Sequence, residues 1–324
     1  MKVSLICTVL NEEDSIAVLL DSVLAQTHRP DEVIIVDGGS RDGTREALHS
    51  YCERLPLRVL VEPGCNISQG RNRAIAASTG NIIASTDAGV RLDPGWLEAL
   101  LTPFGEATPP DVVSGFFVAD PTNAFETALG ATILPNADEI DANKFLPSSR
   151  SIAFRPEAWQ DVSGYPEWLD YCEDLIFDLK LRKAGCSFAW APNAIVHFRP
   201  RQSLASFFRQ YYRYARGDGK ADLWRKRYAI RYSTYLGGAA IMIAGFWQPV
   251  LWLLLVGGAA AYLYQPYHRL SQSSRALTAT QRIAAALWVP AIRLTGDVAK
   301  MAGYPVGVWW RRKKTGGAGA RQAY

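Results

Sequence analysis

The first hundred residues alternate between short apolar runs and segments with the apolar periodicity of helices. Residues 3–9 (VSLICTV) form a continuous apolar run of strand length, and residues 15–27 repeat apolar side chains along one helical face. Further strands are expected at 31–37, 57–62 and 81–87. Because strands and helices alternate at this spacing, the sequence predicts an α/β fold with a parallel sheet that helices cover on both faces.

Regular alternation is lost between residues 103 and 150, where prolines and glycines surround one strand-like stretch at 112–119. Residues 173–185 then show one apolar helical face and a glycine at the expected C-terminal stop. A last short strand is expected at 195–201. We place the α/β domain that contains these elements at residues 1–216.

The chain changes character after this domain. No charged residue lies between Arg231 and His268, a run longer than the stretch of about 20 residues that one membrane-spanning helix needs. Gln248 and Pro249 interrupt the run, so it predicts either one kinked span or a hairpin of two short helices. Basic residues flank both ends, and the positive-inside rule then places both ends in the cytoplasm, which favours the hairpin. A pair of helices buried in a protein core is the alternative.

The sequence therefore predicts three segments after the α/β domain. They are a basic connector at the membrane interface (217–234), a membrane hairpin (235–267) and an amphipathic tail (268–324) that mixes apolar, tryptophan and basic residues as interfacial segments do. No export signal precedes the opening strand, so we expect a protein of the inner membrane whose catalytic domain is cytoplasmic.

Composition narrows the class of protein only slightly. Hydrophobic residues make up 48% and charged residues 20% of the 324 positions, as in globular proteins. The net charge of +4 is mild, but basic residues cluster around 199–231 and at 309–314, beside apolar sequence. This pattern indicates an anionic membrane surface, and no nucleic-acid-binding motif accompanies the charge. The five cysteines form no Cys-x-x-Cys pair, which argues against a zinc site or a disulfide framework.

Polar side chains end three of the predicted strands. Thr8, Asp37 and Asp87 each close an apolar run. Because ligands of parallel α/β sheets bind beyond the carboxyl ends of the strands, we expect these side chains to converge on one crevice. Glycines after Asp37 let the backbone approach a ligand closely, and its carboxylate can accept hydrogen bonds from a nucleotide base or a ribose hydroxyl. A turn or helix-capping aspartate is the alternative.

Three segments carry a further signal when they are taken together. They are residues 8–44 (opening TVLNEEDS), 70–89 (GRNRAIAASTGNIIASTDAG) and 164–185 (GYPEWLDYCEDLIFDLKLRKAG). In combination they resemble family 2 glycosyltransferases, inverting enzymes of the GT-A fold, and the similarity covers roughly residues 3–216. The resemblance implies a Rossmann-like domain that moves a sugar from a nucleotide-diphosphate-sugar to an acceptor. The predicted membrane segment would hold the crevice near a lipid carrier, so we expect a lipid-linked or envelope-glycan acceptor.

The resemblance also assigns nucleotide-sugar contacts to single residues. It places Asp37 at the nucleotide base and matches Thr8 and Glu12 to the nucleotide-contacting segment of the family. Glu12 can equally be an ordinary acidic residue near a helix N-terminus. Arg71 matches an arginine near the nucleotide, where a guanidinium can pair with phosphate in a forked geometry.

Residues 171–178 (YCEDLIFD) hold three carboxylates. In the family the Glu-Asp pair carries the catalytic base at its aspartate, which matches Asp174. A base here removes a proton from the acceptor hydroxyl as that hydroxyl attacks the anomeric carbon. The helix N-terminus favours the ionised form of Asp174, whereas Glu173 and Asp178 raise its affinity for a proton, and the sequence leaves this balance open. Helix capping alone is the alternative.

The loop at residues 85–97 (STDAGVRLDPGWL) resembles a metal-binding loop of the family from which one carboxylate is missing. Asp87 ends a strand, and Gly89 stands where many related loops carry a second aspartate. Asp93 precedes a proline and is expected to cap a helix. We therefore assign a divalent cation, Mg²⁺ or Mn²⁺, to Asp87 and the phosphates of the donor. His197 is a second candidate ligand, in the space that Gly89 leaves.

Further candidates are assigned to the acceptor or the diphosphate. Glu173 and Arg150 are two of them. Residues 209–217 (RQYYRYARG) supply Gln210 and Arg213, which partly match the Gln-x-x-Arg-Trp signature of processive polysaccharide synthases, with a tyrosine in place of the tryptophan. We interpret this stretch as an interfacial helix near the active site.

Two other classes of protein remain open from the sequence. A nucleotidylyltransferase would share the crevice but would be expected to carry an early basic, glycine-rich phosphate loop, and residues 8–15 (TVLNEEDS) have neither character. A catalytically silent membrane scaffold would be expected to lack Asp174 or Asp87, and both are present.

Overall fold

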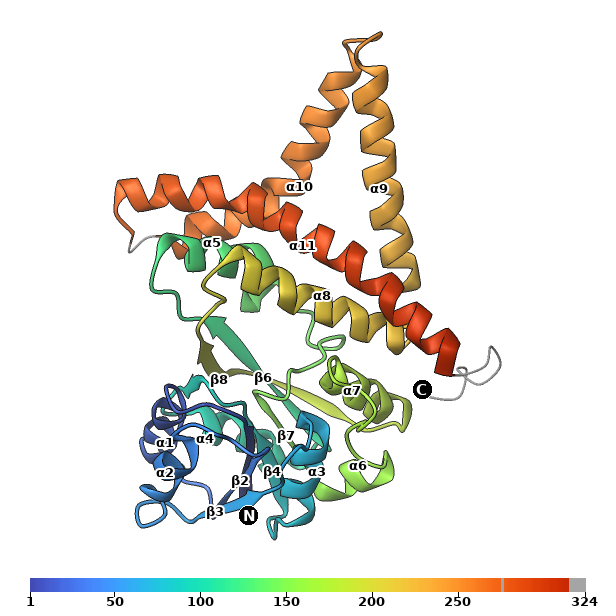
Figure 1. Cartoon of the computed structure of the whole chain (residues 1–324). Helices are drawn as coiled ribbons and strands as arrows, with labels where there is room; N and C mark the ends of the chain where they lie inside the picture. The colour runs from blue at the N-terminus through green and yellow to red at the C-terminus, as the bar shows by residue number, and fades with distance from the viewer. Residues whose placement is uncertain (275–276, 315–324) are drawn as a thin grey trace. The chain divides into compact units, whose positions relative to one another are not determined.

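The computed structural model describes residues 1–274 and 277–314 (Figure 1). The chain divides into two compact units. Among the described residues, unit 1 comprises Met1–Asp120 and Ala137–Arg199, and unit 2 comprises Pro121–Asn136, 200–274 and 277–314. The sequence analysis placed the end of the α/β domain at residue 216. The division falls earlier because the helix that contains residue 216 packs on the C-terminal helix.

Unit 1 is built on one eight-stranded sheet with the strand order β3-β2-β1-β4-β7-β6-β8-β5. The strands are β1 (Val3–Val9), β2 (Glu32–Asp37), β3 (Leu57–Val61), β4 (Ile82–Ser85), β5 (Val90–Leu92), β6 (Val112–Ala119), β7 (Ile152–Phe154) and β8 (Phe188–Phe198). The helices are α1 (Ile16–Leu24), α2 (Thr44–His49), α3 (Ile67–Ala76), α4 (Trp96–Leu101), α6 (Pro156–Asp161) and α7 (Glu173–Lys183), with short 3-10 helices η1 (Thr102–Gly105) and η2 (Ala137–Glu139).

The sheet is mixed, whereas the sequence predicted a parallel one. Strands β1, β2, β3 and β4 pair in parallel, as their alternation with helices requires. Strand β7 runs antiparallel to both β4 and β6, and β5 runs antiparallel to β8. The parallel prediction is wrong here because β5 and β7, of three residues each, carry no signal of strand direction, and antiparallel neighbours need no crossover helix.

The central strands are buried on both faces. In β1, Leu5 and Cys7 pack in one apolar cluster with Trp96 of α4, and Ile6 packs in another with Phe177 of α7. Successive side chains of a strand point to opposite faces. An unbroken apolar run is therefore the sequence form of a strand that is covered on both sides, and this part of the prediction is confirmed.

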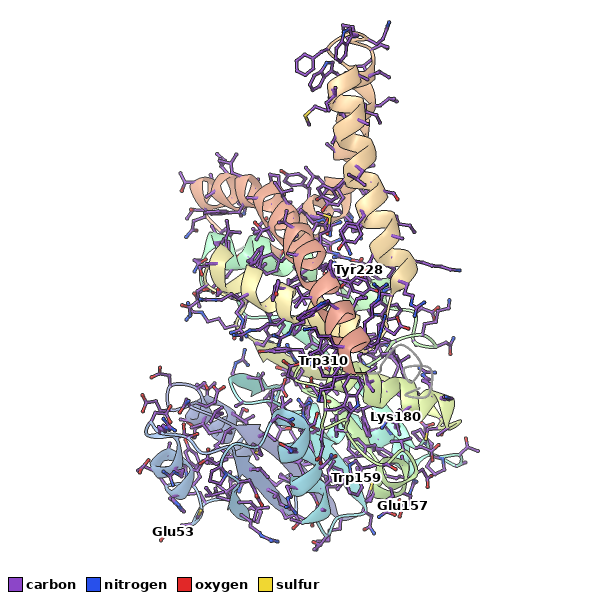
Figure 2. All side chains as sticks on the ribbon, turned by 45° about the vertical axis from the view of Figure 1, so that its right-hand side comes forward. Glu53, Glu157, Trp159, Lys180, Tyr228 and Trp310 are labelled. Atoms are coloured by element: carbon purple, nitrogen blue, oxygen red, sulfur yellow. The ribbon has the colours of Figure 1, made fainter. Side chains whose placement is uncertain are left out.

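Unit 2 consists of helices. They are α5 (Ala124–Ile133), α8 (Leu204–Lys220), α9 (Arg225–Ala244), α10 (Leu251–Ser273) and α11 (Ala279–Lys314). Helices α8 and α11 pack closely. The glycines Gly303 and Gly307 of α11 permit this, because a side chain at either position would overlap the backbone of α8. Tyr228 of α9, labelled in Figure 2, stacks on Tyr304 of α11 with ring centroids 3.7 Å apart.

A buried carboxylate joins three helices of unit 2. Asp297 of α11 accepts hydrogen bonds from Arg231 Nε at 2.9 Å and from the Tyr235 hydroxyl at 3.1 Å, both on α9. The Tyr262 hydroxyl of α10 donates to the same carboxylate. Because a buried charge is stable only when it is paired and hydrogen-bonded, this network fixes α9 and α10 against α11 at one level.

The uncharged run of the sequence folds as two helices, α9 and α10, which meet at a turn formed by residues 245–250 (Figure 1). The indole Nε1 of Trp252 donates to the Gly245 carbonyl at 3.0 Å and closes this turn. Among the residues that the structure describes, no helix is both long and apolar enough to cross a membrane, and the predicted membrane-spanning hairpin at 235–267 is not supported. The predicted tail begins within α10 and continues along α11, and its residues 275–276 and 315–324 lie outside the described part of the chain.

Candidate active site

Three neighbouring strands bring the predicted donor-binding residues to one edge of the sheet. Thr8 lies near the carboxyl end of β1, and Asp37 ends the adjacent strand β2. The amide of Thr86 donates to the Ile6 carbonyl of β1 at 3.1 Å, which places Asp87 beside the same strand ends. Strands β2, β1 and β4 are adjacent in the sheet, so the expected convergence of these side chains at one edge is observed.

Asp37 has one carboxylate oxygen that the protein leaves available. The side chain is fully buried, and its Oδ1 accepts from the amide and the hydroxyl of Ser40 at 2.9 and 2.6 Å. Its Oδ2 is buried without a hydrogen-bond partner among the described residues, and Arg45 Nε lies 3.7 Å away, beyond hydrogen-bond distance. A buried acceptor without a donor is destabilising, so Oδ2 is suited to accept a hydrogen bond from a ligand.

A buried arginine connects two distant parts of the chain. Arg71 of α3 donates from Nη2 to Asp87 Oδ1 at 2.7 Å and from Nη1 to Glu173 Oε1 at 2.8 Å. The sequence analysis expected this guanidinium fork to face phosphate. In the structure both of its amino groups are occupied by carboxylates, and the contact of Arg71 with the nucleotide stays a prediction.

Burial and charge shift the pKa values of this cluster. Burial by itself would lower the pKa of Arg71, but the carboxylates of Asp87 and Glu173 outweigh it and raise that pKa well above its usual range. Burial and the charge of Asp174 raise the pKa of Glu173 to about 7, against the opposing effect of Arg71. Burial, followed by the charge of Asp174, also raises the pKa of Asp178 well above its ordinary value. Burial therefore works against the ionised form of both carboxyls, whereas the ion pair with Arg71 favours that form at Glu173.

Asp174 is the most accessible of the three carboxyls in this segment. Helix α7 begins at Glu173, directly after Cys172, whose φ of +66° lies in the left-handed region. In the first helical turn Asp174 is half-buried, whereas Glu173 and Asp178 are 8% and 1% exposed. Oδ2 of Asp174 lies 3.4 Å from the Ser148 hydroxyl. Of the three carboxyls, Asp174 is therefore best placed to reach an acceptor from outside.

A second arginine lies beside Asp87. Arg150 Nε is 3.6 Å from Asp87 Oδ2, and its guanidinium packs over the rings of Phe117 and Phe198, 5.1 and 4.7 Å from the centroids. This Nε has no hydrogen-bond partner among the described residues. Asp87 is 25% exposed on its side chain, and its Oδ2 accepts no hydrogen bond within the described chain. One oxygen of Asp87 is thus held by Arg71, and the other is open to a ligand.

His197 and Asp93 pair with each other. His197 Nε2 lies 2.7 Å from Asp93 Oδ1, where β5 and β8 run side by side. The expectation that Asp93 caps a helix is wrong, because α4 begins only at Trp96 with Gly95 at its N-cap. The pair with Asp93 engages Nε2 of His197, so Nδ1 is the nitrogen that a cation would use, and the assignment of His197 to a cation stays a prediction. Within residues 1–274 and 277–314, no three His, Cys, Asp or Glu side chains gather as a ready metal site.

Gln210 and Arg213 belong to α8 in unit 2, whereas the other candidates lie in unit 1. Gln210 Nε2 donates to the Tyr214 hydroxyl at 2.8 Å, and its Oε1 accepts from Arg201 Nε at 3.3 Å. The tyrosine that replaces the tryptophan of the synthase signature therefore holds the glutamine. The contact of Gln210 and Arg213 with the acceptor or the diphosphate stays a prediction.

Sequence reasoning overlooked an aromatic support beneath the cluster. The ring of Tyr165 lies under Arg71, 5.3 Å from the guanidinium, and stacks on Phe177 of α7 with centroids 4.1 Å apart. The Tyr165 hydroxyl shares a hydrogen bond of 3.0 Å with Ser149. The sequence offered one indication that Tyr165 belongs to the site: it follows Gly164 in a segment that resembles the family.

A cavity of about 810 Å³ lies elsewhere in unit 1, between α3 and the segment around α6. Its lining includes Glu62, Gln69, Asn72 and Trp159, the last of which is labelled in Figure 2. Trp159 Nε1 donates to Asn72 Oδ1 at 3.0 Å. None of the predicted site residues lines this cavity, so we treat it as separate from the catalytic cluster.

Comparison with known proteins identifies the class that this fold and site define. A sequence model of glycosyl transferase family 2 matches residues 4–160, and a model of glycosyl transferase family group 2 matches residues 145–293. The chain belongs to the family 2 glycosyltransferases. It is an enzyme that transfers a sugar from a nucleotide-sugar, and the comparisons favour neither a nucleotidylyltransferase nor a catalytically silent scaffold.

Curated relatives agree with this class. The glycosyltransferase AglE of Haloferax volcanii is 26% identical over 281 residues, which cover 84% of this chain and 85% of that protein. The succinoglycan biosynthesis protein ExoA of Rhizobium meliloti is 28% identical over 265 residues, with 76% and 78% covered.

Solved structures show the same fold. The mannosyltransferase PcManGT of Pyrobaculum calidifontis, in complex with GDP-Man and Mn²⁺, aligns with a TM-score of 0.55 at 20% identity, over 93% of this chain and 87% of that chain. TarS 1–349 of S. aureus, in complex with UDP-GlcNAc, aligns with a TM-score of 0.52 at 18% identity, over 97% and 92%. The mixed α/β sheet of unit 1 is therefore the sheet of a GT-A glycosyltransferase.

Proposed function

We propose that the sheet edge around Asp37 and Asp87 binds a nucleotide-diphosphate-sugar and that Asp174 is the base of a single, inverting displacement. The acceptor hydroxyl attacks the anomeric carbon, its proton passes to Asp174, and the nucleoside diphosphate leaves from the opposite side. The observation that carries the proposal is Arg71. Its guanidinium holds Asp87 of the donor loop and Glu173 beside the base in one hydrogen-bonded unit.

Burial and pairing favour Asp174 as the base over its two neighbours. Glu173 is hydrogen-bonded to Arg71, and the raised pKa of Asp178 disfavours the ionised form that a base needs. Asp174 is half-buried and lies in the first turn of α7. The helix N-terminus there stabilises negative charge on a carboxylate.

The donor contacts follow from the unpaired polar atoms at the sheet edge. Oδ2 of Asp37 is available to an amine of the base or a ribose hydroxyl. Arg150 Nε faces the open oxygen of Asp87 without a hydrogen bond of its own, and we assign Arg150 to the diphosphate. The related structures contain GDP-Man and UDP-GlcNAc, both nucleoside diphosphate sugars, which supports the same class of donor for this chain.

A divalent cation, which this family commonly uses, fits the site with only a few ligands from the protein. Oδ2 of Asp87 accepts no hydrogen bond within the described chain, although Arg150 Nε lies 3.6 Å away, and Gly89 leaves a space that an added side chain would occupy. Magnesium sites often use one or two carboxylates together with substrate phosphates. When bound, the cation would neutralise charge on the diphosphate. His197 could join this set only through Nδ1, because its Nε2 pairs with Asp93.

The proposed donor class is tested with a panel of nucleotide-sugars. We expect the purified protein to release nucleoside diphosphate from one or a few UDP-, GDP- or dTDP-sugars, with water as a slow acceptor. The same sugars should bind in titration calorimetry. If no member of the panel is bound or hydrolysed by the folded protein, the proposed donor class is wrong.

We further propose that unit 2 binds a membrane surface through the turn between α9 and α10, on the cytoplasmic side of the inner membrane. The turn and the adjoining parts of α9 and α10 carry many exposed apolar side chains, at Leu236, Met242, Ile243, Phe246, Trp247, Val250, Leu253, Leu254 and Val256. No charged residue lies between Arg231 and His268, and Arg225, Lys226 and Arg227 begin α9. An apolar tip with basic residues at its base is typical of segments that insert into an anionic lipid interface. A lipid-linked or envelope-glycan acceptor fits this position.

The double substitution Trp247→Glu with Leu253→Glu is expected to abolish cosedimentation with vesicles that contain phosphatidylserine. Both side chains are exposed in unit 2, and a buried apolar side chain contributes about 1.5–3 kcal/mol, which two carboxylates would remove. Val18→Glu with Val61→Glu is the control, because both valines are also exposed but lie in unit 1. Unchanged sedimentation of the first variant would contradict the membrane proposal.

A further inference from the structure

The space beside Gly89 is approached by a carboxylate from another part of the chain. Gly89 has a φ of +71°, and a Cβ built on it would lie 3.6 Å from Glu12 Oε2 and 3.7 Å from Ser15 Oγ. Glu12 belongs to the loop between β1 and α1, far from Gly89 in the sequence. The position at which a second aspartate is missing from the donor loop is therefore faced by a glutamate.

Glu12 is held in this orientation by several hydrogen bonds. Its amide donates to the Thr44 hydroxyl at 2.7 Å, and its carbonyl accepts from the amides of Ser15 and Ile16 at 3.0 and 2.9 Å. The Ser15 hydroxyl donates to Glu12 Oε2. Within the described chain, Oε1 of Glu12 has no hydrogen-bond partner. The carboxylate is thus positioned by the protein and keeps one oxygen for a ligand.

Glu12 and Asp87 both raise the pKa of the same buried thiol, that of Cys7. Burial raises the pKa of the Cys7 thiol in β1 well above its usual range, the charge of Asp87 adds to this, and the charge of Glu12 adds further, while Arg71 opposes them. Electrostatic effects of this kind fall off with distance. Both carboxylates therefore lie within range of one thiol at the carboxyl end of β1.

We propose that Glu12 supplies the carboxylate that Gly89 lacks, so that a divalent cation bound with a nucleoside diphosphate is held between Asp87 and Glu12. This inference deepens the proposed function and rests on it. Two carboxylate oxygens, phosphate oxygens and water complete the octahedral, oxygen-rich set that Mg²⁺ prefers. The glycine leaves the space beside Glu12 open, since any side chain at position 89 would enter it.

The competing role for Glu12 is a direct contact with the ribose or the base. The two roles differ in their linkage to the metal. A metal ligand strengthens nucleotide binding only when the cation is present, because cation and nucleotide favour each other's binding by the same factor. A direct contact with the nucleotide strengthens binding equally in Mn²⁺ and in chelator.

The test is titration calorimetry with four forms of the full chain: UDP and GDP are titrated in Mn²⁺ and in EDTA, and Mn²⁺ is titrated at saturating nucleotide. We expect Glu12→Gln to lower the affinity for Mn²⁺ at saturating nucleotide by about tenfold or more, since even indirect supports of a metal typically contribute about 10–100-fold. Its nucleotide affinity in EDTA should stay at the wild-type value. Asp14→Asn is the matched control, because it removes a nearby exposed negative charge and should leave both affinities unchanged.

A rescue variant makes the test independent of simple damage to the loop. Glu12→Gln combined with Gly89→Asp should recover most of the lost Mn²⁺ affinity, because aspartate is among the residues that tolerate a positive φ and its carboxylate would enter the same space. Loss of nucleotide affinity in EDTA by Glu12→Gln, or no loss of Mn²⁺ affinity, would overturn the inference. So would equal nucleotide affinity of the wild type in Mn²⁺ and EDTA. Failure of the wild type to bind either nucleotide in any condition would instead count against the proposed function.

Discussion

Asp174→Asn is expected to lower the rate of sugar transfer by about 10²–10⁴-fold and to leave the affinity for the donor nearly unchanged, which is the usual result of removing a general base. Asparagine has nearly the size of aspartate, and its side-chain oxygen can still accept from the neighbouring Ser148 hydroxyl. It cannot take a proton from the acceptor. The rate is measured as release of nucleoside diphosphate from the best donor of the panel, and the affinity by calorimetry with the same donor.

Asp161→Asn is the matched control for this experiment. Asp161 ends α6 on the surface of unit 1, so the same chemical change should leave rate and affinity at wild-type values. A folded Asp174→Asn variant with a near-normal rate would remove Asp174 from the mechanism. Parallel loss of donor affinity and rate would show that Asp174 contacts the donor and would contradict its role as a base for the acceptor.

Arg71→Ala is expected to lower the free energy of unfolding by about 3–5 kcal/mol, the range typical of breaking a buried ion pair from one side. The substitution leaves Asp87 and Glu173 without the guanidinium that both now share. It also releases the donor loop from the helix that carries the base, so transfer should be lost. Unfolding is measured by denaturant titration, followed by circular dichroism.

Two further variants separate the role of Arg71 from its charge. Arg73→Ala removes an exposed arginine from the same helix, whose pair with Glu62 spans 3.7 Å, and should change stability by no more than about 0.5 kcal/mol. Arg71→Lys keeps the charge but cannot reach both carboxylates with a planar fork. It should fold, with a raised KM for the donor and a lowered kcat. Wild-type kinetics and stability in Arg71→Lys would mean that the fork does not position the site.

The sequence predicted those features of the site that depend only on residues close together along the chain. Apolar runs of strand length placed Thr8, Asp37 and Asp87 at strand ends, and a helical face placed Asp174 at a helix start. These features depend on neighbours within a few residues along the chain. Parallel strands present their carboxyl ends at one edge of the sheet, so the convergence of these residues needed no knowledge of the complete fold.

The partners of these residues could not be predicted in the same way. Arg71 and Glu173 are 102 positions apart, and Asp93 and His197 are 104 positions apart. Asp93 precedes a proline, and from local sequence alone it reads as a helix cap. The pairing of β5 with β8 brings His197 to it instead, and the helix begins later.

The sequence by itself determined the glycosyltransferase class, the alternation of strands and helices in the first half of the chain, and the strand-end and helix-start positions of the candidate residues. Only the tertiary structure decided that β7 enters the sheet antiparallel, that α8 packs with α11, that both amino groups of Arg71 are occupied, and that Glu12 faces Gly89. The physical reason is the range of the interactions. Backbone periodicity and turn chemistry act between near neighbours, whereas the contacts of a buried arginine or the space beside a glycine depend on which distant segments the core brings together.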